Sequence, residues 1–153
     1  MQPFPTLIFL DFDGVLRRNT SRLYKLEPDL VRNLENAVLP HTDLKVVITS
    51  SWREAYSTRT IGRLFPSEFA ERIEGATPIA NERSEHYRYT EILAYLRRFH
   101  QKGANWIAID DDPLHYPADA PLILTDPSEG FTSEKAKELN DALCSLGEGP
   151  GPR

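Results

Sequence analysis

The stretch Leu7-Ile8-Phe9-Leu10-Asp11-Phe12-Asp13-Gly14-Val15-Leu16 decides the fold, because a short apolar run leads directly into a pair of carboxylates. Its first four residues form a continuous apolar run, which predicts a β-strand buried on both faces of a parallel sheet. Three further runs have the same character and predict three further strands: Val46-Val47-Ile48, Trp106-Ile107-Ala108-Ile109 and Leu122-Ile123-Leu124.

Apolar residues spaced three and four apart lie between these runs and predict helices. One helix begins near Pro28, and a second carries the apolar stripe of residues 89–99. Residues 51–65 can form another helix, and Thr132 or Ser133 can cap a last one. Strands that alternate with helices predict an α/β fold, a Rossmann-like three-layer sandwich with a mostly parallel central sheet.

The length of 153 residues is that of one domain, which we predict over residues 1–146, with a flexible tail over residues 147–153. The net charge of −5 argues against a general binder of nucleic acids or anionic membranes, but it leaves room for a local basic patch. No apolar run is long enough for a membrane span, and the first residues do not resemble a signal peptide, so the expected location is cytoplasmic. The single cysteine, Cys144, lies in an apolar helical pattern and is predicted to be a small buried core residue.

Polar residues follow three of the predicted strands at the point where each strand ends. Asp11 and Asp13 come directly after the first strand, residues 49–51 follow the second, and Asp110 and Asp111 follow the third. Open α/β sheets bind ligands beyond the carboxyl ends of their strands. These side chains are therefore expected to meet at one site.

The residue types in this group indicate metal and phosphate chemistry. Asp11 and Asp13 are two residues apart in an extended segment, so they can face one substrate together. Neighbouring ionised carboxylates repel each other and need a cation, and oxygen ligands of this kind suit Mg²⁺. Gly14 lets the chain turn sharply and lets backbone N–H groups approach an anion such as phosphate. The alternative is a solvated Asp-Gly turn, but the buried strand before it and the second acidic group favour a site.

The segment Asp11-Phe12-Asp13-Gly14-Val15-Leu16 resembles the first motif of the haloacid dehalogenase (HAD) superfamily. Residues 48–53 and 109–112 are similar to its second and fourth motifs. The run Thr-Ser-Ser-Trp-Arg, together with Arg88 three residues before Glu91, resembles in particular the HAD domains of Swiss-army-knife RNA repair proteins. The likeness covers roughly residues 7–143, and it implies a HAD-like fold.

This resemblance implies a role for each matching carboxylate. Asp11 would be the nucleophile that forms an aspartyl-phosphate intermediate. Asp13 would protonate the leaving oxygen and then deprotonate the attacking water. Asp11, Asp110 and the backbone carbonyl of Asp13 would hold Mg²⁺, with Asp111 as a further ligand or as a residue that orients the ligands.

The resemblance also implies residues that bind the phosphoryl group. Either Thr49 or Ser50 would donate a hydrogen bond to it, because the end of the second strand can shift by one residue. Arg88 would neutralise the charge on the equatorial oxygens, with Arg83 as the alternative cation. The other interpretation of Arg88 is an exposed helix arginine paired with a nearby glutamate. Arg53 is included as a further phosphate contact, and its alternative is a solvated helix start.

The same residues limit the class of reaction and the kind of substrate that we expect. A leaving alkoxide needs a proton whereas a leaving halide does not, so Asp13 favours phosphate transfer over dehalogenation. The segments after Leu16 and Trp52 are too short for a full cap domain, which predicts a nearly capless, open site. Trp52 is expected in the core, with stacking on a base as the alternative. By resemblance the preferred substrate is an RNA end phosphate, and we expect no membrane association and no obligate protein partner. The alternative functions are a phosphatase of small metabolites or nucleotides, a phosphotransferase that acts on a hydroxyl group, and an inactive binding module.

Overall fold

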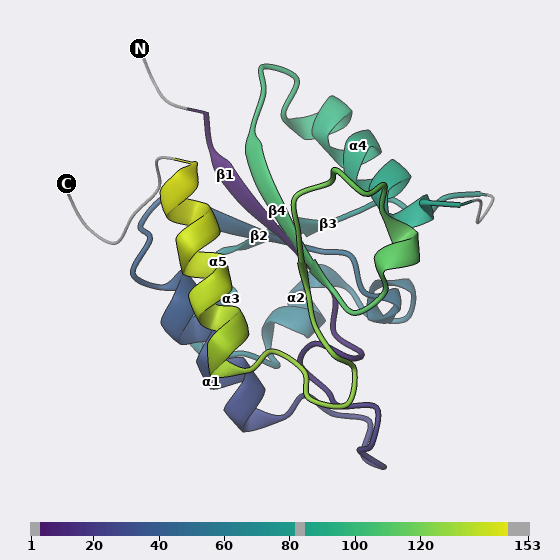
Figure 1. Cartoon of the computed structure of the whole chain (residues 1–153). Helices are drawn as coiled ribbons and strands as arrows, with labels where there is room; N and C mark the ends of the chain where they lie inside the picture. The colour runs from purple at the N-terminus through teal and green to yellow at the C-terminus, as the bar shows by residue number, and fades with distance from the viewer. Residues whose placement is uncertain (1–3, 82–84, 147–153) are drawn as a thin grey trace.

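The computed structural model describes residues 4–81 and 85–146 and shows a central sheet between layers of helices (Figure 1). Neighbouring strands of the sheet all run parallel, in the order β3-β2-β1-β4-β5. The predicted α/β sandwich is confirmed, and the predicted tail over residues 147–153 lies outside the described residues. The strands are β1 (Thr6–Leu10), β2 (Leu44–Ile48), β3 (Ile73–Ala76), β4 (Asn105–Asp110) and β5 (Leu122–Leu124).

The helices begin where the sequence offers a suitable first residue. Pro28 lies in the first turn of α1, where a backbone N–H would have no acceptor within the helix, so proline costs no hydrogen bond there. The hydroxyl of Thr132 accepts a hydrogen bond from the N–H of Lys135 and so caps α5. No helix in the described part of the chain is long and apolar enough to cross a membrane. The helices are α1 (Pro28–Val38), η1 (Ser51–Glu54), α2 (Thr58–Gly62), α3 (Ser67–Ala70), α4 (Tyr87–Phe99), η2 (Pro113–His115) and α5 (Ser133–Ser145), of which η1 and η2 are 3₁₀ helices.

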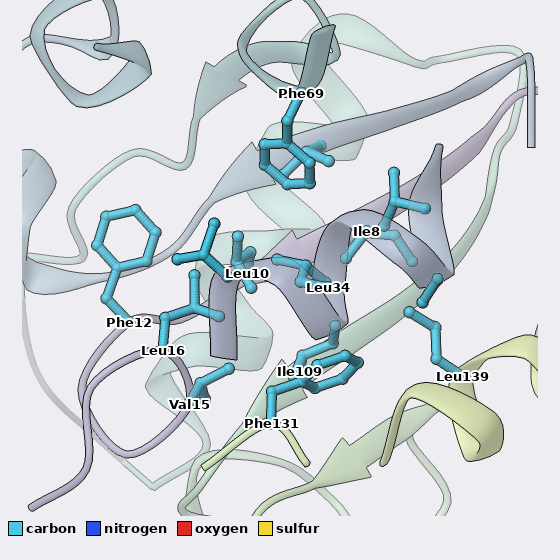
Figure 2. Close-up of a cluster of buried hydrophobic side chains, with 14 of the residues drawn as sticks. Ile8, Leu10, Phe12, Val15, Leu16, Leu34, Phe69, Ile109, Phe131 and Leu139 are labelled. Carbon is cyan, nitrogen blue, oxygen red and sulfur yellow. The ribbon is translucent and has the colours of Figure 1, made fainter. Parts of the chain in front are cut away.

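Helices cover both faces of the sheet and create two separate cores. In Figure 1, α1 and α5 lie together on one face and α4 lies on the other. Ile8 and Leu10 of β1 pack in the first core with residues of α1 and α5 (Figure 2). Leu7 and Phe9 pack in the second core, where they meet Tyr95 of α4. Alternate residues of β1 thus point to opposite buried faces, which explains its unbroken apolar sequence.

Three local features differ from the predictions. β3 was not predicted, because Ile73–Ala76 is a short, partly exposed edge strand that contains a glutamate and a glycine. Residues 51–65 do not form one helix, because Ser57 is extended and its hydroxyl accepts the N–H of Thr60 to start α2. Cys144 is exposed and not part of the core, since α5 turns the neighbouring Leu143 inward instead.

The nearly capless architecture is confirmed by the segments that follow β1 and β2. Residues 11–27 form a loop that leads directly into α1. Residues 49–72 form η1, α2 and α3, and their buried Ile61, Phe65 and Phe69 pack in the same core as α1. These helices therefore belong to the main body of the domain and do not form a separate cap.

Candidate active site

The strand register places three polar residues level with one another at the carboxyl edge of the sheet. Ile48 of β2 and Ile109 of β4 both pair with Leu10 of β1, so the residues that follow them, Thr49, Asp110 and Asp11, lie level with one another. The N–H of Thr49 donates to the carbonyl of Leu10 (2.9 Å), and the N–H of Asp11 donates to that of Ile109 (3.1 Å). The strand order reverses between β1 and β4, and such points are where open α/β sheets bind ligands.

The alternation of side chains along β1 turns Asp11 toward α4. Leu10 and Phe12 pack in the core beneath α1 and α5, so Asp11, which lies between them, faces the opposite side of the sheet. Arg88, in the first turn of α4, is buried on that side and interacts electrostatically with Asp11. The fold thus brings a cation from a helix to a carboxylate at a strand end.

Asp11, Asp110 and Asp111 form an acidic cluster. One carboxylate oxygen of each residue lies within 4.8 Å of the others, a spacing that could hold a metal ion. Oδ1 of Asp110 accepts the backbone N–H groups of Asp111 (2.7 Å) and Asp112 (3.1 Å). Oδ2 of Asp110 accepts the hydroxyl of Tyr116 (3.0 Å). Asp110 is therefore the most firmly held carboxylate of the cluster.

The three carboxylates have different proton affinities. Burial, and then the charge of Asp110, raises the pKa of Asp11 well above its ordinary value. Burial, and then the hydrogen bond and charge of Asp110, raises the pKa of Asp111 to about 7. Burial also acts to raise the pKa of Asp110, but the nearby His115 ring and the backbone N–H groups outweigh it and lower that pKa. Three negative charges at this spacing need protons or a cation, so the cluster fits a divalent metal ion.

Gly14 allows the loop to approach the acidic cluster. Its φ of +80° lies in the left-handed region, which favours glycine. A Cβ atom at this position would overlap the carboxylate of Asp111. The absence of a side chain at Gly14 therefore allows this loop to pack closely against the carboxylate of Asp111.

We expect Gly14→Ala to cost about 1–3 kcal/mol in the free energy of unfolding, because alanine is strained at this φ and meets Asp111. It should also weaken divalent-cation binding by roughly tenfold or more through the displaced carboxylate. Thermal unfolding with and without Mg²⁺ measures both effects. Gly62→Ala in α2 is the matched control, since its Cβ meets only Ala70 at 3.9 Å, and it should be neutral or slightly stabilising. Equal behaviour of the two variants would contradict the assigned contact.

Asp13 lies beside the acidic cluster, but its side chain is not part of it. Its Oδ1 is 3.1 Å from Nη1 of Arg17, and its Oδ2 accepts the indole N–H of Trp52 at 3.2 Å. The Asp13 carboxylate is partly exposed, whereas Asp11 is buried. Two fixed donors therefore hold an accessible carboxylate two residues beyond Asp11.

Thr49 and Ser50 differ in how their hydroxyl groups are used. Oγ of Ser50 accepts the backbone N–H of Trp52 at 3.2 Å and caps η1. Oγ1 of Thr49 is buried without a hydrogen-bond partner among the described residues. Thr49 is also the residue that lies level with Asp11. The geometry therefore favours Thr49 over Ser50 as a hydrogen-bond donor to a ligand beside Asp11.

Arg88 is buried, which excludes the interpretation of an exposed helix arginine. Its Nη1 is 3.0 Å from Oε1 of Glu91, and its Nε is buried without a partner among the described residues. Burial lowers the pKa of Arg88, but Asp11 and Glu91 outweigh burial and raise it overall. Arg83, the alternative cation, lies outside the described residues.

Arg53 has a structural role that the sequence did not indicate. Its Nη2 is 2.9 Å from Oε2 of Glu91, so Glu91 holds both Arg53 and Arg88. All five guanidinium N–H groups point to protein acceptors, and none is left for the predicted phosphate contact. The structure therefore favours a structural role for Arg53 over the predicted phosphate contact. The sequence does not reveal this role, because the other acceptors are backbone carbonyls: those of Thr49, Ser50, Thr77 and Pro78.

Tyr116 belongs to the site although no sequence signal indicated it. Its hydroxyl is buried against Asp110, six residues earlier in the chain. Burial and the charge of Asp110 raise the pKa of Tyr116 well above its ordinary value, so it remains a donor. The η2 turn between the two residues brings the Tyr116 hydroxyl back to Asp110. The sequence around Tyr116 carries no pattern that predicts this contact.

The model of one protein family matches residues 7–136, and that family is described as the HAD domain in Swiss Army Knife RNA repair proteins. The matched range runs from β1 into α5 and contains every carboxylate of the acidic cluster. Searches of curated proteins and of solved structures found no match.

Proposed function

The chain belongs to the family of HAD domains found in Swiss Army Knife RNA repair proteins, and from this premise we propose that it is a Mg²⁺-dependent phosphohydrolase acting on nucleic-acid end phosphates. The observation that carries this proposal is the position of buried Asp11, level with Thr49 and Asp110 and facing Arg88. Two carboxylates, a hydroxyl group and a guanidinium thus come together at one edge of the sheet, and in our proposal they act as nucleophile, metal ligand, hydrogen-bond donor and cation.

The proposed reaction begins with attack of an Asp11 carboxylate oxygen on phosphorus. The bond from phosphorus to the leaving oxygen breaks, and that oxygen takes a proton from Asp13. In the second half, Asp13 removes a proton from water, the water oxygen attacks phosphorus, and Asp11 is released as a carboxylate. The partly exposed position of Asp13 suits it to meet both the leaving group and the water.

The acidic cluster supports the proposed cofactor. Asp11, Asp110 and Asp111 would hold Mg²⁺, and the bound ion would supply the positive charge that keeps Asp11 ionised and offsets the phosphoryl charge. Without a cation, burial and Asp110 favour the protonated form of Asp11, which is a poor nucleophile. Tyr116 fixes Asp110 by its hydrogen bond, as residues behind metal ligands commonly do.

Thr49 and Arg88 would bind the phosphoryl group. The unpartnered hydroxyl of Thr49 can donate to one phosphoryl oxygen. The guanidinium of Arg88 keeps donors that Glu91 does not use, and its charge would stabilise the transition state. Glu91 positions this arginine and does not itself contact the phosphate in our proposal.

A panel of phosphorylated substrates tests the proposal. We expect phosphate release from 3′- or 5′-phosphorylated oligonucleotides with Mg²⁺, loss of release with a chelator, and recovery when Mg²⁺ is restored. Nucleotides, sugar phosphates and phosphopeptides are the comparison substrates. A preference for free metabolites would reject nucleic-acid ends, and no release from any substrate with Mg²⁺ would reject the phosphohydrolase.

A further inference from the structure

A small aromatic pocket opens beside Asp13, between the loop that follows β1 and helix α2. Its volume is about 190 Å³. Its walls are largely aromatic and aliphatic, and its hydroxyl groups belong to two tyrosines and one threonine. We call it the aromatic pocket; it is lined by Tyr24, Trp52, Tyr56, Thr60, Ile61 and Leu64.

The tyrosines of this pocket are exposed to a degree that core packing does not explain. Tyr24 is 60% exposed and Tyr56 is 45% exposed, whereas Trp52 between them is only 4% exposed. The Tyr24 ring stacks on Trp52 with centroids 4.4 Å apart, and Tyr56 lies 6.5 Å from Trp52 in a tilted arrangement. Trp52 is therefore a core residue, as predicted, while the two tyrosines offer aromatic surface to a ligand.

The pocket is joined to the candidate active site through a shared residue. Trp52, which lines the pocket, donates its indole N–H to Asp13. The hydroxyl of Tyr24 is also close enough for the Asp13 charge to add to the effect of burial in raising its pKa. A ligand in the pocket would therefore lie next to a phosphate that reacts at Asp11.

Three arginines lie at the pocket or along the α2 segment that forms one of its walls, although the chain is acidic overall. The guanidinium of Arg17 lies 5.2 Å from the centroid of the Tyr24 ring. Arg59 and Arg63, one turn apart on and just after α2, are exposed and line a second groove of about 530 Å³, to which Glu71 also contributes. Aromatic surface combined with arginine side chains is the combination that binds bases and backbone phosphates of single-stranded nucleic acids.

We propose that the aromatic pocket stacks the terminal base of a single-stranded nucleic-acid end, while Arg59 and Arg63 contact the phosphates that follow it. The proposal rests on the proposed function, because the end phosphate of the same strand would lie at Asp11. A base must be unpaired to enter such a pocket, so a single-stranded end is the matching partner. Specificity for the end then comes from stacking, while the acidic cluster acts on phosphate alone.

Binding by the full chain carrying Asp11→Asn, which prevents turnover, tests the pocket. Fluorescence anisotropy compares a labelled, phosphorylated oligonucleotide with the same strand lacking its terminal base. We expect the intact end to bind about tenfold more tightly, on the scale of base–aromatic stacking. Tyr56→Ala, and separately Tyr24→Ala, should reduce this ratio to near one, and Tyr24→Phe should keep it.

Phe99→Ala is the matched control. Phe99 is also an exposed ring (57%), but it lies before the start of β4, near the amino ends of the strands and away from the site. It should leave the ratio unchanged. Arg59→Ala combined with Arg63→Ala should flatten the salt dependence of oligonucleotide binding. Equal binding of intact and base-free ends would overturn the proposal. Self-association of the chain that Tyr56→Ala abolishes would also overturn it, because the pocket would then bind a second copy of the protein. Failure of the proposed function differs, since it appears as absent turnover in the unsubstituted chain.

Discussion

Asp11→Asn is expected to lower kcat on any phosphorylated substrate by a factor on the order of 10⁴ or more, because the variant has no carboxylate oxygen to attack phosphorus. Substrate binding should persist, since Thr49 and Arg88 remain. The fold should persist too: burial and Asp110 both disfavour charge on Asp11, and asparagine carries none. The measurement is phosphate release at saturating Mg²⁺, together with thermal unfolding of the metal-free protein.

Asp43→Asn is a suitable control for the loss of one carboxylate. Asp43 is exposed and lies directly before β2, at the edge of the sheet opposite to the site. This variant should turn over like the parent chain. If Asp11→Asn retained more than about a hundredth of the parent rate, another group would be the nucleophile and the assignment of Asp11 would fail.

Arg88→Met is expected to lower kcat/KM by about 10²–10³-fold, the scale for losing one group that stabilises the transition state. Methionine fills similar space without charge, so the effect should fall on catalysis more than on packing. Glu91 keeps Arg53 and the N–H of Ala80 as partners, which limits the loss of stability. Steady-state kinetics and urea unfolding on the same preparation separate the two effects.

The control for this change is Arg98→Met in the same helix. Arg98 is exposed near the carboxyl end of α4, whereas Arg88 lies in its first turn. Arg98→Met should leave kcat/KM and stability within error of the parent. A loss for Arg88→Met that appeared only in stability, with kcat/KM unchanged in the folded fraction, would assign Arg88 a purely structural role.

How much of the fold the sequence predicts depends on burial. β1, β2 and β4 were predicted because buried strands in a parallel sheet have continuous apolar sequences, and the edge strand β5 was predicted because its three residues are all apolar. β3 was not, since an edge strand that is exposed on one side needs no such run. The break between η1 and α2 was also missed, because one serine side chain decides where α2 begins.

The candidate site was predictable where chemistry follows a strand end. Asp11, Thr49 and Asp110 come together because neighbouring parallel strands end at the same edge, and that geometry can be derived from the sequence. Contacts set by loops and helices cannot be derived in this way. The sequence predicts a phosphate contact for Arg53, whose guanidinium donates to backbone carbonyls in the structure, and it gives no signal for Tyr116, which holds Asp110.

Chemical trapping on Asp11 tests the central claim most directly. The protein is mixed with substrate and Mg²⁺, quenched in acid during turnover, and treated with borohydride, which reduces an acyl phosphate to an alcohol. We predict homoserine at position 11 in the digested peptide, absent when substrate is withheld. Turnover without any modified residue at position 11, or with the modification on another carboxylate, would contradict the account.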